Sequence, residues 1–310
     1  MTEAILFLVA GLILLLLGSN FLVNSTERFS NTFSISGFIA SFFLIGVATS
    51  APEIFVSIES AILDQTILAI GNAIGSNLSN VALVFAISTF FIPVNTRSIY
   101  LPSSAFVGMM ILTLTMYLLI FFDGLFDNVD SIILIVLFLG VLFFIQKNDN
   151  DVSQSTEYDM EFNLIKIIFS LLSGIVLLVY GSDYFIHGAT QVALFFGISS
   201  YVIGLTLTAL GTSLPELAAS IQSARKGRGD FIVGNIIGSN IFNIAIAMSI
   251  AGLINTSVVK EEEFTRDVAL LLLSSVVFYI IIKSDKILIK TLYSGLLVIT
   301  YLVYIFFILR

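Results

Sequence analysis

Two stretches of the chain decide its fold: residues 46–53, which read GVATSAPE, and residues 209–216, which read ALGTSLPE. Each stretch lies in the middle of a long apolar run, where a glutamate is costly and therefore unexpected. A second motif follows each of them, GNAIGSNLSN at residues 71–80 and GNIIGSNIFN at residues 234–243. The same pair of polar motifs thus occurs twice, at a constant offset of 163 residues.

The repeat extends over most of each half of the chain. Residues 11–80 align with residues 174–243 without a gap, and 24 of the 70 aligned pairs are identical. Many of the identities are Gly, Ser, Thr, Pro, Asn and Glu, which a shared lipid-facing composition does not favour. We interpret the chain as a first repeat at 1–146 and a second at 164–310, joined by a flexible acidic linker at 147–163.

The composition predicts an integral membrane protein. Of 310 residues, 58% are hydrophobic and 11% are charged, whereas about 25% are charged in a typical soluble domain. The net charge of −8 disfavours binding to nucleic acid. The chain has no cysteine and one histidine, which excludes disulfides, thiolate metal sites and multi-histidine metal sites.

The apolar runs predict ten membrane-spanning helices, because about 20 apolar residues are needed to cross the hydrocarbon layer. Five spans in each half is an odd number, so the second half must insert upside down relative to the first. This arrangement is typical of secondary transporters, whose binding site lies at the midplane between the halves. The predicted spans are 4–22, 36–62, 66–92, 100–122, 131–146, 164–185, 199–224, 229–254, 267–283 and 287–308.

The motifs also predict that helices 2, 3, 7 and 8 are broken around the site. Pro52 and Pro215 each remove a backbone donor and free a carbonyl one turn earlier. Glycines in the second motif should loosen helices 3 and 8. Irregular backbone is tolerated in a membrane where it lines a cavity.

The basic residues predict the orientation in the cell membrane. Ten of the 13 basic residues fall on one face of the ten-span arrangement and three on the other. The face with more basic residues is expected to be cytoplasmic, which places the linker in the cytoplasm and both termini outside. On this reading the run from Arg225 to Arg228 serves to fix topology.

Glu53 and Glu216 are the sharpest candidates for a functional role. They occupy equivalent positions near the middle of their spans, and no basic residue lies near either of them in its helix. The partners left for these carboxylates are protons or bound cations. Thr49 and Ser57 share a helix face with Glu53 at spacings of four residues, as Thr212 and Ser220 do with Glu216.

The second motif adds more oxygen atoms at the same spacing, from Asn72, Ser76 and Asn80 and from Asn235, Ser239 and Asn243. Ca²⁺ is bound by six to eight oxygen atoms, and two glutamates neutralise one Ca²⁺. Na⁺ has a similar ionic radius and could use the same oxygens, whereas the soft ligands of Zn²⁺ and Cu⁺ are missing.

These motifs resemble the two alpha repeats of the cation/Ca²⁺ exchanger superfamily, and in particular those of prokaryotic sodium/calcium exchangers. The resemblance covers nearly the whole chain. It implies antiport of several Na⁺ against one Ca²⁺ through a shared site, by alternating access, with helices 1 and 6 sliding against the remaining bundle. By residue match, the resemblance implies cation ligands at Glu53, Glu216, Thr49, Ser50, Ser76, Asn80, Thr212, Ser213, Ser239 and Asn243, with backbone carbonyls of Gly46 and Ala209.

Two positions depart from the family pattern. Ala48 stands where the family usually has glycine, as the second half does at Gly211. Asn243 stands where K⁺-dependent relatives carry aspartate, so the resemblance favours exchange without K⁺.

Three alternatives to Na⁺/Ca²⁺ exchange remain open. A proton/Ca²⁺ exchanger could use the same glutamates, although the residues after Asn72 disfavour that branch of the family. A passive cation channel would need no counter-ion. An intramembrane enzyme is the least favoured, because the sequence shows no catalytic pairing. We expect no cofactor and no obligatory protein partner besides the lipid bilayer and the transported Ca²⁺ and Na⁺.

Overall fold

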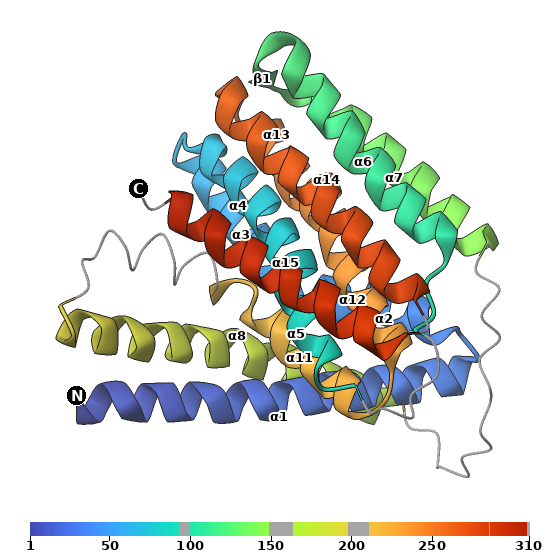
Figure 1. The fold of residues 1–310 in the computed structure, drawn as a ribbon, viewed down its shortest axis with the longest axis vertical. Helices are drawn as coiled ribbons and strands as arrows, with labels where there is room; N and C mark the ends of the chain where they lie inside the picture. Colours follow the sequence, from blue (N-terminus) through green and yellow to red (C-terminus); the bar gives the residue numbers. More distant parts are fainter. Residues whose placement is uncertain (93–98, 149–163, 198–210, 285, 309–310) are drawn as a thin grey trace.

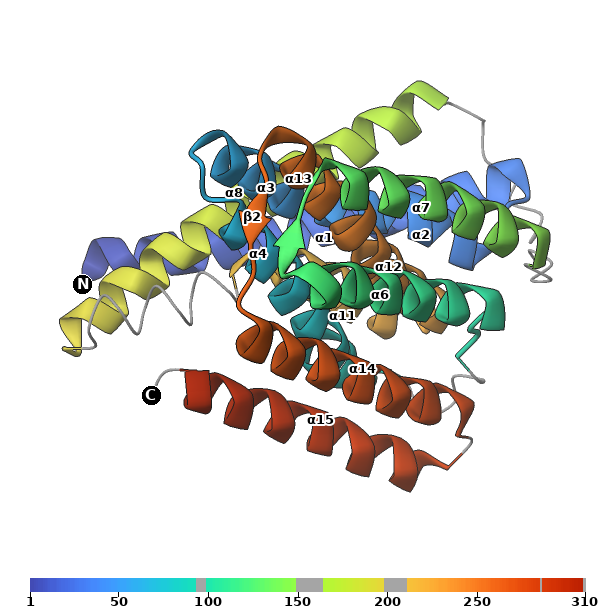
Figure 2. The ribbon, with the colours of Figure 1, turned by 90° about the horizontal axis from the view of Figure 1, so that it is seen from above.

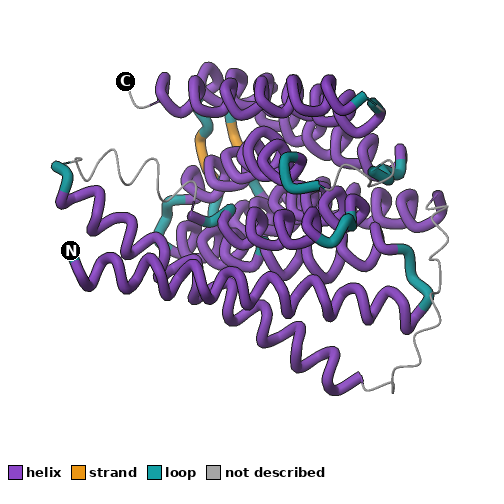
Figure 3. Tube along the Cα trace, turned by 60° about the horizontal axis from the view of Figure 1, so that its bottom comes forward, coloured by secondary structure: helices purple, strands orange, loops and turns teal. Residues whose placement is uncertain are grey.

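The computed structural model describes residues 1–92, 99–148, 164–197, 211–284 and 286–308. Its elements are almost entirely helical (Figures 1 and 3). They are α1 (Thr2–Phe33), α2 (Gly37–Thr49), α3 (Ala51–Ile62), α4 (Thr66–Ser79), η1 (Asn80–Phe85), α5 (Ala86–Thr89), α6 (Ser103–Asp123), β1 (Leu125–Phe126), α7 (Asn128–Asn148), α8 (Leu164–Phe195), α11 (Leu214–Arg225), α12 (Gly229–Phe242), η3 (Asn243–Met248), α13 (Ser249–Ile254), β2 (Ser257–Val258), α14 (Glu261–Lys283) and α15 (Ile287–Ile308).

The distribution of side chains is that of a membrane protein. Eight helices in the described part are long and apolar enough to cross a bilayer, or nine if the bent pair α2–α3 counts as one span. Large apolar side chains such as Phe122 and Leu288 are exposed, whereas many serines, asparagines and both candidate glutamates are buried. The remaining predicted span, 199–224, is described only from Gly211 onwards, and most of the linker lies outside the described residues.

The predicted break in helix 2 has a clear counterpart. α2 ends at Thr49, α3 begins at Ala51, and the two axes are bent by 44°. Ser50 between them has φ −82° and ψ 2°, outside the usual helical values. In the second half, Ser213 has the matching values of φ −87° and ψ 4°, and α11 starts directly after it.

Helices 3 and 8 depart from α geometry elsewhere than at their glycines. The backbone is regular α-helix through Gly71 and Gly75 in α4 and through Gly234 and Gly238 in α12. The backbone changes to π-helix directly after α4 and α12, in two stretches of six residues, η1 and η3, which start at Asn80 and Asn243. π-helical turns are rare and are often found at functional sites. The two stretches cover equivalent positions of the repeat, at the offset of 163 residues.

The glycines of α12 serve helix packing instead. A Cβ built on Gly238 would lie 2.6 Å from the carbonyl oxygen of Phe42 in α2. From the other side, a Cβ on Gly46 would lie 3.2 Å from the Cα of Gly238. The backbones of α2 and α12 therefore touch, which only small residues permit, and this contact brings the first motif of one half against the second motif of the other.

Helices α1 and α8 lie side by side along one edge of the molecule, α14 and α15 cross in front of the central helices, and α6 and α7 lie farthest from α1 (Figures 1 and 2). α1 and α8 have 32 residues each, which corresponds to about 48 Å of helix. Both are longer than the predicted spans 4–22 and 164–185, and longer than a perpendicular crossing of about 30 Å requires.

The contact between α1 and α8 obeys the two-fold relation of the repeat. A Cβ on Gly18 would lie 2.8 Å from the backbone nitrogen of Leu178, and a Cβ on Gly181 would lie 2.8 Å from that of Leu15. Gly11 and Gly174 make the same kind of close approach to the opposite helix. These four glycines match in two pairs at the offset of 163 residues, so the repeat that the sequence shows is also a spatial one.

The end of α1 near Phe33 is held by an ion-pair network that we call the Glu27 cluster, comprising Glu27, Lys226, Arg228 and Asp230. Lys226 and Arg228 lie 2.7 Å and 3.0 Å from the Glu27 carboxylate, and Arg228 lies 2.7 Å from Asp230. Burial lowers the pKa of Arg228, but the hydrogen bonds and charges of Asp230 and Glu27 outweigh this effect and raise it above its usual value. Lys226 and Arg228 therefore bind α1, in addition to the topological role that the sequence predicts for the run from Arg225 to Arg228.

Replacing Glu27 with glutamine is expected to loosen this end of α1. The change removes both ion pairs of Glu27, and hydrogen bonds to charged groups contribute about 1.5–3 kcal/mol. Hydrogen exchange of backbone amides around residues 24–33 should become about 10-fold faster or more, as measured by mass spectrometry. Glu263→Gln is the matched control, because its pair with Lys260 is strongly exposed and its loss should leave the exchange unchanged. Unchanged exchange in Glu27→Gln would show that the cluster does not hold α1.

Candidate cation-binding site

In each repeat a glutamate lies in the first turn of a helix. Glu53 lies in the first turn of α3 and Glu216 in the first turn of α11, each directly after a proline. Proline is well tolerated at this position because the first N–H groups of a helix have no intrahelical acceptor. The partial positive charge of a helix N-terminus favours carboxylates there, so the local sequence positions both groups and offsets part of their burial cost.

Both glutamates are fully buried, at 0% exposure. Ser76 donates a hydrogen bond of 3.0 Å to Oε1 of Glu53. Oε2 of Glu53 and both carboxylate oxygens of Glu216 have no hydrogen-bond partner. The five ion pairs among the described residues all lie elsewhere. An unpaired buried carboxylate is strongly unfavourable, so three unmet oxygen atoms in one region indicate a site that accepts positive charge.

Hydroxyl groups from both halves lie around Glu216. Thr49 and Ser239 are connected to Glu216 through Asn235, which accepts a hydrogen bond from Thr49 and donates one to the backbone oxygen of Glu216. Thr49 lies 3.3 Å from the hydroxyl of Ser239, which in turn lies 3.3 Å from the carbonyl oxygen of Gly46. These contacts join α2 to α12 across the repeat, and they bring Thr49, Ser239, Gly46 and the two glutamates into one site.

The asparagines of the second motif contribute amide groups. Asn243 donates a hydrogen bond of 3.2 Å to Ser76, the serine that binds Glu53. Asn80 and Asn243 are both fully buried, and the side-chain oxygen of each has no hydrogen-bond partner. The hydroxyls of Ser50, Ser213 and Thr212 are also without a partner. Ala209, the remaining predicted ligand, lies outside the described residues.

Asn235 links several of these groups, although the sequence showed it only as part of a polar stripe. It accepts a hydrogen bond of 3.0 Å from Thr49 and donates to Ser220 at 2.9 Å and to the backbone oxygen of Glu216 at 3.2 Å. Thr49, Ser220 and Glu216 each have an equivalent residue in the other half of the chain. Asn235 therefore connects α12 to the backbone of α11 at Glu216 and to Thr49 of α2.

The equivalent residues in the other half do not form this network. Thr212 corresponds to Thr49, Asn72 to Asn235 and Ser57 to Ser220. The hydroxyls of Thr212 and Ser57 and the amide nitrogen of Asn72 have no hydrogen-bond partner. The two halves therefore share their polar residues but hold them in different arrangements.

Asn77 and Asn240 were not among the predicted site residues, although both belong to the repeated motif. Asn77 donates a hydrogen bond of 3.0 Å to the backbone oxygen of Asn240, and Asn240 donates one of 3.2 Å to that of Asn77. The two hydrogen bonds exchange with each other under the offset of 163 residues. The sequence could have indicated them, because asparagine occurs at the same position of both repeats.

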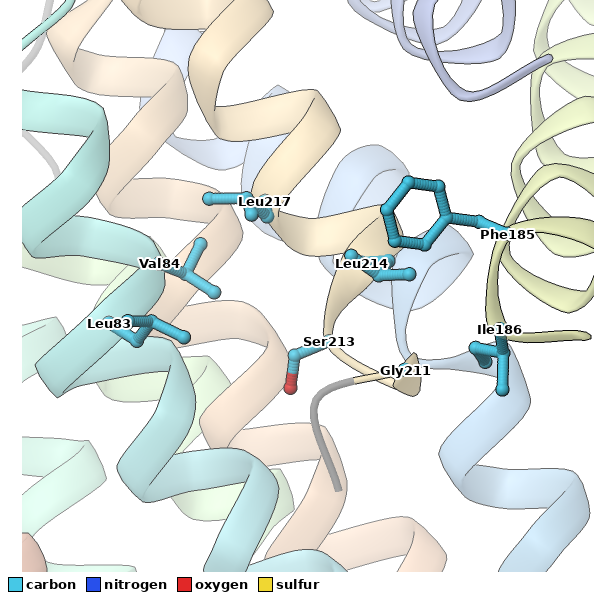
Figure 4. Close-up of a pocket in the computed structure, with 8 residues that line it drawn as sticks. All are labelled: Leu83, Val84, Phe185, Ile186, Gly211, Ser213, Leu214 and Leu217. Atoms are coloured by element: carbon cyan, nitrogen blue, oxygen red, sulfur yellow. The ribbon is translucent and has the colours of Figure 1, made fainter. Parts of the chain in front are cut away.

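A cavity of about 190 Å³ approaches Ser213 from the side of α8. Its walls are apolar, and the hydroxyl of Ser213 is the polar side-chain group among the residues drawn (Figure 4). Apart from that hydroxyl, the side chains of this surface offer no ligand to a cation. The lining residues are Leu83, Val84, Phe185, Ile186, Gly211, Ser213, Leu214 and Leu217.

The unbonded groups of the candidate site are oxygen atoms, the kind of ligand that hard cations prefer. The described residues contain no group of three His, Cys, Asp or Glu side chains that could hold a metal ion. Two carboxylates would therefore supply the charge, while hydroxyl, amide and carbonyl oxygens complete the coordination. Ca²⁺ is commonly bound by carboxylates mixed with neutral oxygens.

Comparison with known proteins gives one consistent result. The family model described as sodium/calcium exchanger protein matches residues 3–147 and 166–310. An uncharacterized membrane protein of Methanocaldococcus jannaschii is 32% identical, over 91% of this chain and 90% of the relative. The sodium/calcium exchanger MaX1 of Methanosarcina acetivorans is 26% identical, over 91% of this chain and 92% of the relative. A solved structure of the sodium-calcium exchanger NCX_Mj aligns with a TM-score of 0.82 and 30% identity, over 98% of this chain and 99% of the other.

Proposed function

The chain belongs to the sodium/calcium exchanger family, a family of membrane transporters, and we propose that it exchanges Na⁺ for Ca²⁺ at one site built on Glu53 and Glu216. The observation that carries this proposal is the pair of fully buried glutamates with three unbonded carboxylate oxygens. The similarity to MaX1 and NCX_Mj, both named as sodium/calcium exchangers, supports the choice of the two ions.

The proposed ligands are the oxygen atoms of the two glutamates and of the residues around them. Two carboxylates balance the charge of one Ca²⁺, and several Na⁺ in the same chamber displace it. An empty site would leave two bare carboxylates in a low-dielectric interior, which is costly. The site therefore changes sides only when it is filled, and this couples the two fluxes. The neutral ligands are Thr49, Ser50, Ser76, Asn80, Thr212, Ser213, Ser239 and Asn243, with the carbonyls of Gly46 and Ala209.

The proposed architecture has ten spans in two inverted repeats, 1–146 and 164–310, with a cytoplasmic linker at 147–163. The reciprocal contacts of the α1–α8 glycines and of Asn77 with Asn240 support the two-fold relation. The excess of basic residues on one face supports a cytoplasmic linker and external termini. Alternating access then requires the two halves to exchange conformations around the site.

Ca²⁺ uptake by proteoliposomes tests the coupling ion. Vesicles loaded with Na⁺ and diluted into Na⁺-free medium should accumulate radioactive Ca²⁺, because outward Na⁺ flow drives the exchange. Vesicles with equal Na⁺ on both sides should not accumulate it. If more than two Na⁺ move per Ca²⁺, a membrane potential should change the rate of uptake.

The same experiment distinguishes the second candidate, proton/Ca²⁺ exchange. Protonation is another way to neutralise a buried carboxylate, and both oxygens of Glu216 are free to accept a proton. Uptake driven by a pH gradient in the absence of Na⁺ would overturn Na⁺ coupling in favour of protons. Uptake that needs no counter-ion and never exceeds equilibrium would indicate a channel.

A further inference from the structure

Four asparagines from the two repeats meet, and their amide groups form a closed set of hydrogen bonds. Asn77 and Asn240 donate to each other's backbone oxygens, as described above. Asn243 donates a bond of 3.1 Å to the side-chain oxygen of Asn77. Asn80 donates a bond of 3.1 Å to the side-chain oxygen of Asn240. All four contacts obey the offset of 163 residues, so each half contributes one inner and one outer asparagine.

The direction of each amide follows from the atoms it faces. A backbone carbonyl only accepts hydrogen bonds, so Asn77 must turn its nitrogen toward Asn240 and present its oxygen on the other side. Asn243 must then turn its own nitrogen toward the oxygen of Asn77, because two oxygens would repel each other. The oxygen of Asn243 is thereby turned away from the pair. The same sequence of steps, starting from Asn240, fixes the amide of Asn80.

The oxygens released in this way are left without a partner inside the protein. The side-chain oxygens of Asn80 and Asn243 have no hydrogen-bond partner, although both residues are fully buried. The nitrogen of Asn243 also donates to Ser76, which donates to Glu53. An amide with a purely structural role would satisfy its oxygen as well, since an unmet buried acceptor costs about 1–3 kcal/mol. The network instead uses its donors internally and leaves the oxygens of Asn80 and Asn243 unbonded, with Asn243 connected to Glu53 through Ser76.

We propose that Asn77 and Asn240 are positioning residues that fix the amides of Asn243 and Asn80 with their oxygens toward the transported cation. This inference rests on the proposed function, since it assumes that Ca²⁺ binds between Glu53 and Glu216. It assigns a role to two residues that do not themselves bind the ion. Without Asn240, the amide of Asn80 loses its hydrogen-bond acceptor and can present an NH₂ group, which repels a cation. Without Asn77, the amide of Asn243 keeps only its bond to Ser76 and is held less firmly.

A double-mutant cycle on purified protein tests this role. The dissociation constant of Ca²⁺ is measured by isothermal titration calorimetry for the wild type, Asn77→Ala, Asn243→Ala and the double variant. Asn77→Ala should weaken binding about 10-fold, the effect of losing one hydrogen-bonded ligand. The double variant should bind no more weakly than Asn243→Ala alone, because Asn77 acts through Asn243. The cycle of Asn240→Ala with Asn80→Ala should give the same pattern.

Ser88→Ala is the matched control. Ser88 is buried in the same span and bonds only the backbone oxygen of Val84, and the repeat equivalent is already an alanine, Ala251. Its dissociation constant should equal that of the wild type. Asn77→Ser provides a smaller change with the same expected result if Asn77→Ala does not fold.

Additive losses in the cycles, or unchanged Ca²⁺ binding in Asn77→Ala and Asn240→Ala, would overturn the positioning role. If the double-mutant cycles are non-additive as expected but Na⁺-driven Ca²⁺ uptake fails, Na⁺ coupling is overturned and the positioning role of Asn77 and Asn240 stands. A wild-type protein that binds no Ca²⁺ would overturn both.

Discussion

Replacing Glu53 or Glu216 with glutamine is expected to abolish Ca²⁺ transport. Glutamine keeps the size of the side chain and one oxygen, but the site then carries one negative charge against the two positive charges of Ca²⁺. Leaving a buried charge without its partner costs about 3–5 kcal/mol, so Ca²⁺ affinity should fall by at least 100-fold. Uptake of radioactive Ca²⁺ into proteoliposomes, with calorimetric binding on the same preparations, measures both effects.

Glu59→Gln is the control for this prediction. Glu59 lies on the same helix as Glu53 but is exposed, and its repeat equivalent in the second half is already a glutamine, Gln222. This variant should transport Ca²⁺ at the wild-type rate. Near-normal exchange by both Glu53→Gln and Glu216→Gln would refute the proposed site, whatever the behaviour of the control.

The second large effect is expected at the contact between α1 and α8. Gly18→Val or Gly181→Val places a branched side chain where even a Cβ would lie 2.8 Å from the backbone of the facing helix. Overpacking a core costs typically 1–3 kcal/mol, and here the obstacle is backbone, which cannot move aside as a side chain can. We expect the helices to separate and Ca²⁺ uptake to fall by 10-fold or more.

Gly140→Val is the control that shows whether the loss of Ca²⁺ uptake is specific to the contact between α1 and α8. Gly140 is exposed on α7, and no described atom lies within 4 Å of the position of its Cβ. The variant should keep both uptake and thermal stability. Gly18→Ala, which adds one methyl group, should have a smaller effect than Gly18→Val. Full activity of the valine variants at both positions would show that α1 and α8 need not pack closely for transport.

The sequence predicted the parts of the structure that depend on local chemistry. Pro52 and Pro215 predicted breaks in helices 2 and 7. The structure has a bend between α2 and α3, and α3 and α11 begin one residue before the prolines. The unpaired glutamates indicated a buried site, because an apolar run offers no other partner. The family assignment is confirmed by the match over both halves of the chain.

The remaining features depend on contacts between distant residues. Gly238 was expected to loosen its helix, but it lies against Phe42 of α2, about 196 positions away in the chain. Lys226 and Arg228 were interpreted as a topology signal because Glu27, their partner, is equally remote. The support given by Asn235 to the Glu216 backbone likewise requires knowledge of how α11 and α12 pack. Such pairings have no periodic signal in a single sequence.

The Glu27 cluster has an energetic consequence for a protein built from inverted repeats. Two identical halves would make the two transport states equal in free energy, and each would be half populated. The repeat equivalents of Glu27, Lys226 and Arg228 are Thr190, Leu63 and Gln65, which cannot form the same ion pairs. In the proposed alternating-access cycle the cluster would stabilise the state described here without an equal contribution to the other, and about 1.4 kcal/mol of such a difference would shift the populations to roughly ten to one. Surface charges far from the cation would then decide on which side of the membrane the resting protein awaits its substrate.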